Sequence, residues 1–479
     1  MVIEKYKKLP KPAKASLWFL ICSFLQKGIS TITTPIFTRL LSTAEYGNYS
    51  VFNSWLGIVS IIVTLDLFAG VYTQGIVKFD DKRNQFSSAL QGLTLALTVG
   101  WTIIYLVEKS FWNELLGLST VQMLAMLVLV WTSAAFRFWA AYERVTYSYV
   151  KLVLLTIVVS IAKPVVGIYF VTKAQDKVTA RILGLALVEV VCYAGLFFVQ
   201  VRRERKLFDA KFWKYALLFN LPLVPHYLSQ IVLNNSDRLM INSIVGADAA
   251  GIYSLAYSLS QIMTLFSTAL LQTIEPWIYQ KIKAKKIHDI PRIAYLSLAA
   301  IAFINLVLIV FAPEAVRIFA PQAYFDAIWV IPPVAMSVYF MYSYSLFANF
   351  EFYFEKRSFI MSASILGAAL NVGLNYIFIP IYGYYAAGYT TLVCYIIYAI
   401  GHYVFMQKVL KEELNITKLY SLKVLLAISI GFLGLGFGIM ATYQFPLVRY
   451  SIIALLGVIA ILKRKVVMNV IRTFLAIRK

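Results

Sequence analysis

The sequence predicts an all-α integral membrane protein with about 14 transmembrane helices. Hydrophobic residues make up 61% of the 479 residues and charged residues only 14%, whereas soluble domains carry about 25% charged residues. Apolar runs of about 20 residues, long enough to cross a hydrocarbon core roughly 30 Å thick, recur from Ala15 to the residues before Lys463. These observations exclude a soluble enzyme.

The expected helices follow one another along the chain, each as an apolar run bounded by short loops that hold basic residues. The first six are expected at 15–38, 47–70, 85–107, 120–142, 149–171 and 181–201. Six more are expected at 213–236, 251–275, 292–312, 325–348, 357–379 and 385–406, and a last pair at 420–440 and 447–462. They define an N-terminal lobe at 1–201, a C-terminal lobe at 213–406 and accessory spans at 420–462.

The basic residues predict the orientation of the chain. Lys and Arg number 44 against 22 Asp and Glu, a net charge of +22, and most of the basic residues fall on one side if both termini are cytoplasmic. The positive-inside rule therefore places both termini, with the basic tail 463–479, in the cytoplasm. Because membrane topology accounts for the charge, no nucleic-acid partner is expected.

The longest inner linker, 202–214, alternates basic residues with Leu207, Phe208, Phe212 and Trp213. Such a cationic amphipathic segment suits a helix lying in the anionic interface of the inner leaflet. It falls between the sixth and seventh spans, where two lobes would need a tether. The outer loops are short, which leaves no room for the extracellular domain that many envelope polymerases carry.

A short internal repeat indicates two related lobes. Gly47, Tyr49 and Ser50 align with Gly251, Tyr253 and Ser254 at a constant offset, and both copies follow the first helix of a six-helix unit. Two six-helix lobes in a pseudo-twofold arrangement around a central cavity are the architecture of alternating-access transport. Coincidence, arising from shared turn and interface preferences, is the alternative.

Four segments together resemble the polysaccharide flippases (Wzx type) of the multidrug/oligosaccharidyl-lipid/polysaccharide superfamily. They are Arg39 to Tyr49, Asn235 to Ile241, Gly251 to Ser254 and Asn371 to Leu392. The resemblance covers nearly the whole chain and implies twelve core helices plus a terminal pair.

The resemblance also implies a function. The expected activity is translocation of a polyprenyl-diphosphate-linked oligosaccharide, the repeat unit of a surface polysaccharide such as lipopolysaccharide O-antigen, capsule or exopolysaccharide, from the cytoplasmic to the outer leaflet. The expected location is the bacterial cytoplasmic (inner) membrane. The partners would be this lipid-linked sugar, membrane lipids and a polysaccharide polymerase.

Three cations within the expected spans are candidates for binding the diphosphate: Lys27, Arg137 and Lys163. Lys27 lies too deep for its stem to reach the headgroups, and a cation at mid-depth costs about 3 kcal/mol, so it marks a pathway or a paired charge. The alternatives are an ion pair of Lys27 with Asp66, a salt bridge of Lys163 with Glu189, and an Arg137 side chain that extends to the interface.

Polar residues recurring at helical spacing are candidates for lining the cavity. Amide and hydroxyl groups mixed with aromatic rings suit sugars, although polar helix packing predicts many of the same residues. The candidates are Ser23, Ser30, Thr34, Gln230, Asn234, Tyr257, Gln261, Asn371 and Asn375.

The sequence offers no enzymatic site and no site for a cofactor or metal. It contains no G-x-x-x-x-G-K-[ST] loop and no H-E-x-x-H motif, and its three cysteines show no C-x-x-C spacing. Energy is therefore expected from an ion gradient, such as that of protons or sodium, from the membrane potential, or from consumption of the product on the far side. Asp66, Glu189 and Asp237 are the candidates for ion coupling. An ion-coupled multidrug or metabolite exporter of the same superfamily is the alternative function, and a membrane glycan polymerase is a more distant one.

Overall fold

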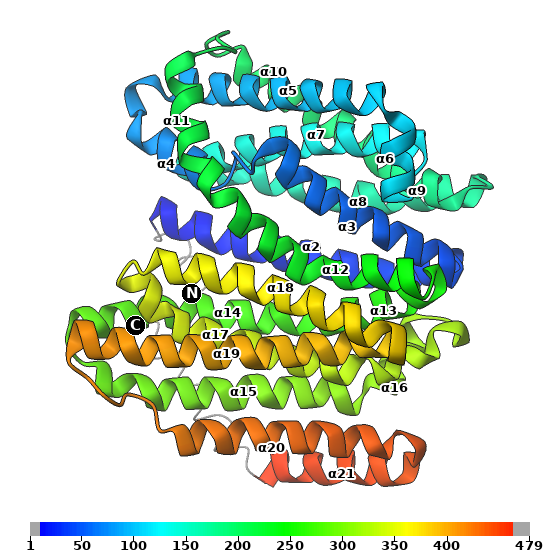
Figure 1. Ribbon diagram of the computed structural model, residues 1–479, viewed down its shortest axis with the longest axis vertical. Helices are drawn as coiled ribbons and strands as arrows, with labels where there is room; N and C mark the ends of the chain where they lie inside the picture. The colour runs from blue at the N-terminus through cyan, green and yellow to red at the C-terminus, as the bar shows by residue number, and fades with distance from the viewer. Residues whose placement is uncertain (1–9, 463–479) are drawn as a thin grey trace. The chain divides into compact units, whose positions relative to one another are not determined.

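The computed structural model describes residues 10–462, and the described residues form helices joined by short loops, without a β-strand. The chain divides into two compact units that meet in the sequence between Leu239 and Met240, and each is described by itself. Figure 1 labels the helices in chain order. The expected tail 463–479 lies outside the described residues.

The first unit contains the expected spans one to seven. Its elements are α2 (Lys11–Leu40), α3 (Thr43–Thr64), α4 (Gly70–Lys78), η1 (Asp80–Lys82), α5 (Arg83–Val107), α6 (Lys109–Leu116), α7 (Thr120–Val145), α8 (Tyr149–Lys173), α9 (Lys177–Glu189), the π-helical η2 (Val190–Ala194), α10 (Gly195–Val201), α11 (Ala210–Asn220), η3 (Leu221–Leu223) and α12 (Val224–Ile244), which continues into the second unit.

The second unit contains the remaining expected spans. Its elements are α13 (Ala247–Ser260), α14 (Ile262–Lys283), η4 (Ile287–Asp289), α15 (Ile290–Val310), α16 (Ala312–Phe319), η5 (Gln322–Trp329), α17 (Ile331–Tyr353), α18 (Arg357–Tyr382), α19 (Tyr385–Leu414), α20 (Leu422–Ala441), η6 (Thr442–Gln444) and α21 (Pro446–Leu462).

The predicted fold class is confirmed, but the number of 14 spans is not. Among the described residues, 10 helices are long and apolar enough to cross a membrane, or 11 if the bent pair η5 and α17 forms one span. The three other predicted spans correspond to α2 and α3, which carry polar residues along their lengths, and to α21, which has only 17 residues.

Side-chain caps fix where several helices begin. Ser42 accepts a hydrogen bond from the Glu45 amide, and the Glu45 carboxylate accepts one from the Ser42 amide, which closes a capping box at the start of α3. Ser119 and Gln122 form the same box at the start of α7. Each cap therefore fixes the residue at which its helix begins after a short loop.

The second predicted span, 47–70, is interrupted in the structure. The helix α3 ends at Thr64, and Leu65 and Asp66 both take the left-handed conformation, with φ of 51°. The freed carbonyl of Leu65 accepts a hydrogen bond from the side-chain amide of Asn220, a residue far away in sequence. Broken backbone is tolerated in a membrane protein only where such protein groups satisfy it.

The linker 202–214 packs on the first unit through its second half. The carboxylate of Asp209 caps α11 and accepts a hydrogen bond of 2.8 Å from Gln85 on α5. The indole of Trp213 donates to the carbonyl of Ala89, and the Leu207 backbone lies against Gly92. Figure 1 shows α11 beside α4 and α5. The segment is therefore anchored to α5.

Candidate functional site

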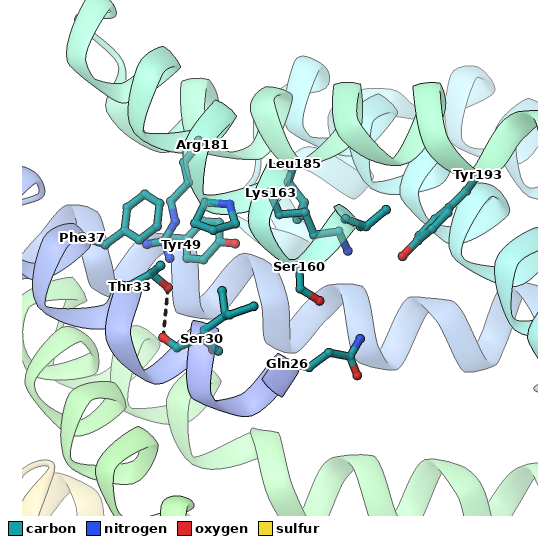
Figure 2. Close-up of a pocket in the computed structure, with 14 residues that line it drawn as sticks. Gln26, Ser30, Thr33, Phe37, Tyr49, Ser160, Lys163, Arg181, Leu185 and Tyr193 are labelled. Carbon is teal, nitrogen blue, oxygen red and sulfur yellow. Dashed lines mark hydrogen bonds between the residues drawn. The ribbon is translucent and has the colours of Figure 1, made fainter. Parts of the chain in front are cut away.

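A polar pocket of about 290 Å³ opens between α2, α8 and α9 of the first unit, with Tyr49 of α3 and Tyr193 of η2 also in its wall. This volume equals that of roughly ten water molecules. Figure 2 shows Lys163 and Ser160 across from Gln26, and Arg181 beside the rings of Phe37 and Tyr49. The polar lining comes from Gln26, Ser30, Thr33, Ser160, Lys163 and Arg181.

The helices α8 and α9 pack closely along this pocket because glycines face each other. A Cβ atom added to Gly184 would lie 3.2 Å from the Cα of Gly167, which is tighter than ordinary packing. Gly167 itself lines the pocket, as does Pro164 one turn earlier. The small residues bring the two helices together, so that side chains from both reach the same space.

Lys163 and Glu189 form a salt bridge beside the pocket. The ammonium of Lys163 lies 2.6 Å from Oε1 of Glu189, whose other oxygen accepts hydrogen bonds from the hydroxyls of Thr132, at 2.9 Å, and Ser133, at 2.8 Å. The Lys163 side chain is 30% exposed and that of Glu189 only 6%. The predicted alternative of a salt bridge between these two residues is therefore confirmed, and Lys163 still faces the pocket.

Arg181 is a second cation in the pocket and is not among the site residues predicted from the sequence. Its guanidinium lies 3.7 Å from the ring centroid of Phe37 and 3.6 Å from that of Tyr49. Aromatic faces attract a guanidinium and hold its plane in one orientation. Arg181 is the first residue of the expected sixth span, and the sequence does not show that rings from α2 and α3 hold it in the pocket.

The structure does not bring the three predicted diphosphate ligands together. Lys163 lines the pocket, whereas Lys27 is exposed on α2 and Arg137 is exposed on α7. The Arg137 guanidinium lies 4.7 Å from the ring centroid of Phe68 and interacts electrostatically with Asp66. Among the described residues, the alternative ion pair of Lys27 with Asp66 does not form.

The candidate lining residues of the first unit occupy different surroundings. Ser30 lines the pocket, while the hydroxyls of Ser23 and Thr34 donate to backbone carbonyls of α2. On α12 the side-chain amide of Asn234 donates to the carbonyl of Gln230 at 2.7 Å. Their role in sugar binding stays a prediction.

The candidate lining residues of the second unit include a buried polar cluster. The amide of Asn375 donates to the Asn371 side chain at 3.3 Å, and the Thr390 hydroxyl donates to Asn375. Tyr257 is buried on α13, and Gln261 stands at the break between α13 and α14. The asparagines thus join α18 to α19.

The three candidates for ion coupling also differ in their surroundings. Glu189 is held by Lys163, and Asp66 stands in the break after α3. Asp237 is 1% exposed on α12. No group of three or more His, Cys, Asp or Glu within residues 10–462 could hold a metal ion.

Several solved structures of membrane proteins share this fold. The lipid II flippase MurJ, in an inward closed conformation, matches with a TM-score of 0.67 at 15% identity, over 94% of this chain and 100% of that chain. An inward-facing multidrug resistance MATE family transporter of the MOP superfamily matches with a TM-score of 0.60 at 13% identity, over 82% of this chain and 96% of that chain. The VcmN MATE transporter of Vibrio cholerae matches with a TM-score of 0.54 at 16% identity, over 84% of this chain and 97% of that chain. The chain therefore shares its fold with this flippase and these transporters.

The sequence comparisons then give the family. Residues 13–282, more than half of the chain, match the family model described as polysaccharide biosynthesis protein. The chain therefore belongs to this family. Lsg locus protein 1 of Haemophilus influenzae is 22% identical over 385 residues, which cover 76% of this chain and 90% of that protein. The resemblance stated from the sequence motifs is confirmed.

Proposed function

We propose that this protein is a flippase that moves a polyprenyl-diphosphate-linked oligosaccharide, the repeat unit of a surface polysaccharide, from the cytoplasmic to the outer leaflet by alternating access. The polysaccharide biosynthesis family and the likeness of the fold to a lipid II flippase support this proposal. The observation that carries it is the cationic pocket lined by Lys163 and Arg181.

The pocket suits a diphosphate because it holds an ammonium and a guanidinium, two groups that donate hydrogen bonds to phosphate oxygens. A guanidinium presents five N–H groups in a planar fork that matches phosphate oxygens. The rings of Phe37 and Tyr49 hold the guanidinium of Arg181 in place. An ammonium has three N–H groups, and Lys163 uses one of them on Glu189. The two other N–H groups of Lys163 can donate to a bound anion.

The rest of the substrate would meet different surfaces. The hydroxyl and amide groups of Gln26, Ser30, Thr33 and Ser160 line the same pocket and suit the sugar nearest the diphosphate. The lipid chain would stay in the bilayer. Lys27 and Arg137, both exposed, are proposed to attract the headgroup before it enters the pocket.

The membrane setting is part of the same proposal. The positive-inside rule supports a bacterial inner-membrane location with both termini in the cytoplasm. A proton or sodium gradient would supply the energy, and a polysaccharide polymerase would use the product.

Purified protein reconstituted in vesicles tests the proposal. A fluorescent lipid-linked oligosaccharide should move between leaflets, as shown by quenching from outside, and Arg181→Gln and Lys163→Gln should each reduce the rate. Lys173→Gln, an exposed lysine on the same helix as Lys163, is the matched control and should keep the wild-type rate. Transport of cationic drugs without movement of the lipid-linked sugar would instead support a multidrug exporter.

A further inference from the structure

A buried carboxylate and a buried imidazole meet in the second unit. Glu351 lies near the end of α17 and His402 lies on α19. The Nδ1 atom of His402 is 3.0 Å from one carboxylate oxygen of Glu351 and 2.9 Å from the other. The His402 side chain is 2% exposed and that of Glu351 is 0% exposed. Two ionisable groups therefore share a position with no access to water.

Aromatic rings surround the imidazole. The ring centroid of His402 lies 4.6 Å from that of Tyr398, 5.3 Å from that of Tyr344 and 5.5 Å from that of Phe359 on α18. Its second nitrogen, Nε2, is buried and has no hydrogen-bond partner among the described residues. The hydrogen bond to Glu351 is therefore the one polar contact of this ring within residues 10–462.

The pair differs from Glu189, a buried carboxylate of the first unit, in the donors that hold it. Glu189 accepts hydrogen bonds from an ammonium and two hydroxyls, groups that keep their protons at neutral pH. The carboxylate of Glu351 has one side-chain donor, the His402 imidazole. Imidazole gains and loses a proton in the physiological range. The Glu351 and His402 pair is therefore suited to exchange a proton.

Charge balance fixes how many protons the buried pair holds. A carboxylate with an imidazolium, or a carboxylic acid with a neutral imidazole, has no net charge and carries one exchangeable proton. Loss of that proton leaves a lone carboxylate among aromatic rings, and gain of another leaves a lone imidazolium. Each lone charge is costly in an apolar interior, so the pair keeps its proton until water or a new partner reaches it.

Among the side chains that the structure describes, the neighbouring elements place no other charge on this pair. Tyr344 and Tyr398 are the ionisable groups beside the ring. Further ionisable groups on the elements packed against α17 and α19 are bonded elsewhere or exposed: Glu275 and Lys281 on α14, Tyr295 on α15, Lys356 before α18, and Lys423 on α20.

We propose that Glu351 and His402 form the proton-binding site of the transport cycle. The pair holds one proton while α17 and α19 are packed together, and releases it when movement of these helices admits water. A proton is taken up from one side of the membrane and given up to the other. This inference rests on the proposed transport function, because the cycle is what moves the helices.

Infrared spectroscopy tests proton binding without any substrate. Full-length protein in lipid nanodiscs is measured at pH values between 5 and 8, the range in which a solvent-exposed histidine exchanges its proton, and isotope labelling of Glu and His identifies the bands in the wild type. We expect one proton that is shared by the carboxyl and the imidazole, is held across this range, and is absent in Glu351→Gln and in His402→Asn. Glu413→Gln, an exposed carboxylate on the same helix as His402, is the matched control and should keep it. Equal bands in the wild type and both pair variants would overturn the proposal.

Flux measurements test the coupling. With one proton per cycle, a gradient of about one pH unit shifts the leaflet distribution of the lipid-linked sugar about tenfold. Glu351→Gln, which keeps the shape of the carboxyl group, should lose this shift. If Glu351→Gln does not fold, His402→Asn replaces it in the assay and should also lose the shift. A gradient response that both variants retain would contradict the proposal. No flux in the wild type would contradict the proposed function instead, while the infrared titration would still decide whether the pair binds a proton.

Discussion

Removing one partner of the Lys163 and Glu189 salt bridge should have unequal effects on stability. In Lys163→Met, the Glu189 carboxylate keeps its two hydroxyl donors, but it is 6% exposed and loses its counter-charge. Breaking a buried ion pair in this way costs about 3 kcal/mol in the free energy of unfolding. In Glu189→Gln, Lys163 is 30% exposed at the pocket and can be hydrated, so the cost should be about 1 kcal/mol.

The expected difference of about 2 kcal/mol can be measured by steric trapping in bicelles, which reports unfolding under native conditions. The double variant should be more stable than Lys163→Met alone, because it removes the uncompensated charge. In the same samples, Glu189→Gln should bind a polyprenyl diphosphate more tightly, since the Lys163 ammonium is released. If Glu189→Gln lowered the free energy of unfolding as much as Lys163→Met, the claim that the buried Glu189 carboxylate needs the charge of Lys163 would be refuted.

Three further variants test separate parts of the structure. Arg181→Lys keeps the positive charge but loses the planar guanidinium, so the affinity for a polyprenyl diphosphate, measured by calorimetry, should fall about tenfold. Gly92→Ala would place a Cβ atom 2.0 Å from the Leu207 carbonyl oxygen and should lower the free energy of unfolding by about 2 kcal/mol, whereas Gly100→Ala, with no atom within 4 Å, should not lower it. Asp209→Ala should lower the free energy of unfolding by about 1 kcal/mol, because it removes the side chain that caps the start of α11. Burial raises the pKa of Asp209, but hydrogen bonds from a lysine, a backbone amide and a glutamine outweigh it and lower this pKa below 3.8. The wild type should therefore lose the stability that the cap provides only as the pH falls below that value. An Asp209→Ala deficit that persisted unchanged in acid, or equal stability of the two glycine variants, would contradict the packing described for the linker.

The order of the helices was predictable because apolar runs mark them directly. All 14 predicted spans coincide with helical segments of the described chain, and capping boxes at Ser42 and Ser119 set two of the starts. The break after Thr64 was not predictable, because the left-handed residues Leu65 and Asp66 depend on a hydrogen bond from the distant Asn220. Such a contact leaves no local pattern in the sequence.

The candidate site was predicted only in part, for the same reason. Lys163 and Glu189 lie at similar depths on the neighbouring fifth and sixth predicted spans, so a salt bridge between them is a prediction of the sequence. The structure contains this salt bridge. Arg181 was missed because its place in the pocket depends on rings from α2 and α3. Glu351 lies one turn beyond the predicted end of the tenth span at 348. The helix α17 continues to Tyr353, so the structure places Glu351 inside the helix.

The most direct test of the central claim is the leaflet distribution of lipid-linked oligosaccharide in cells that lack this protein, with and without the wild-type chain restored. The flippase proposal predicts that the lipid-linked sugar accumulates on the cytoplasmic leaflet, that surface polysaccharide is lost, and that the wild-type chain reverses both effects while Lys27→Glu does not. An unchanged distribution and amount of lipid-linked sugar in the deletion strain would contradict it.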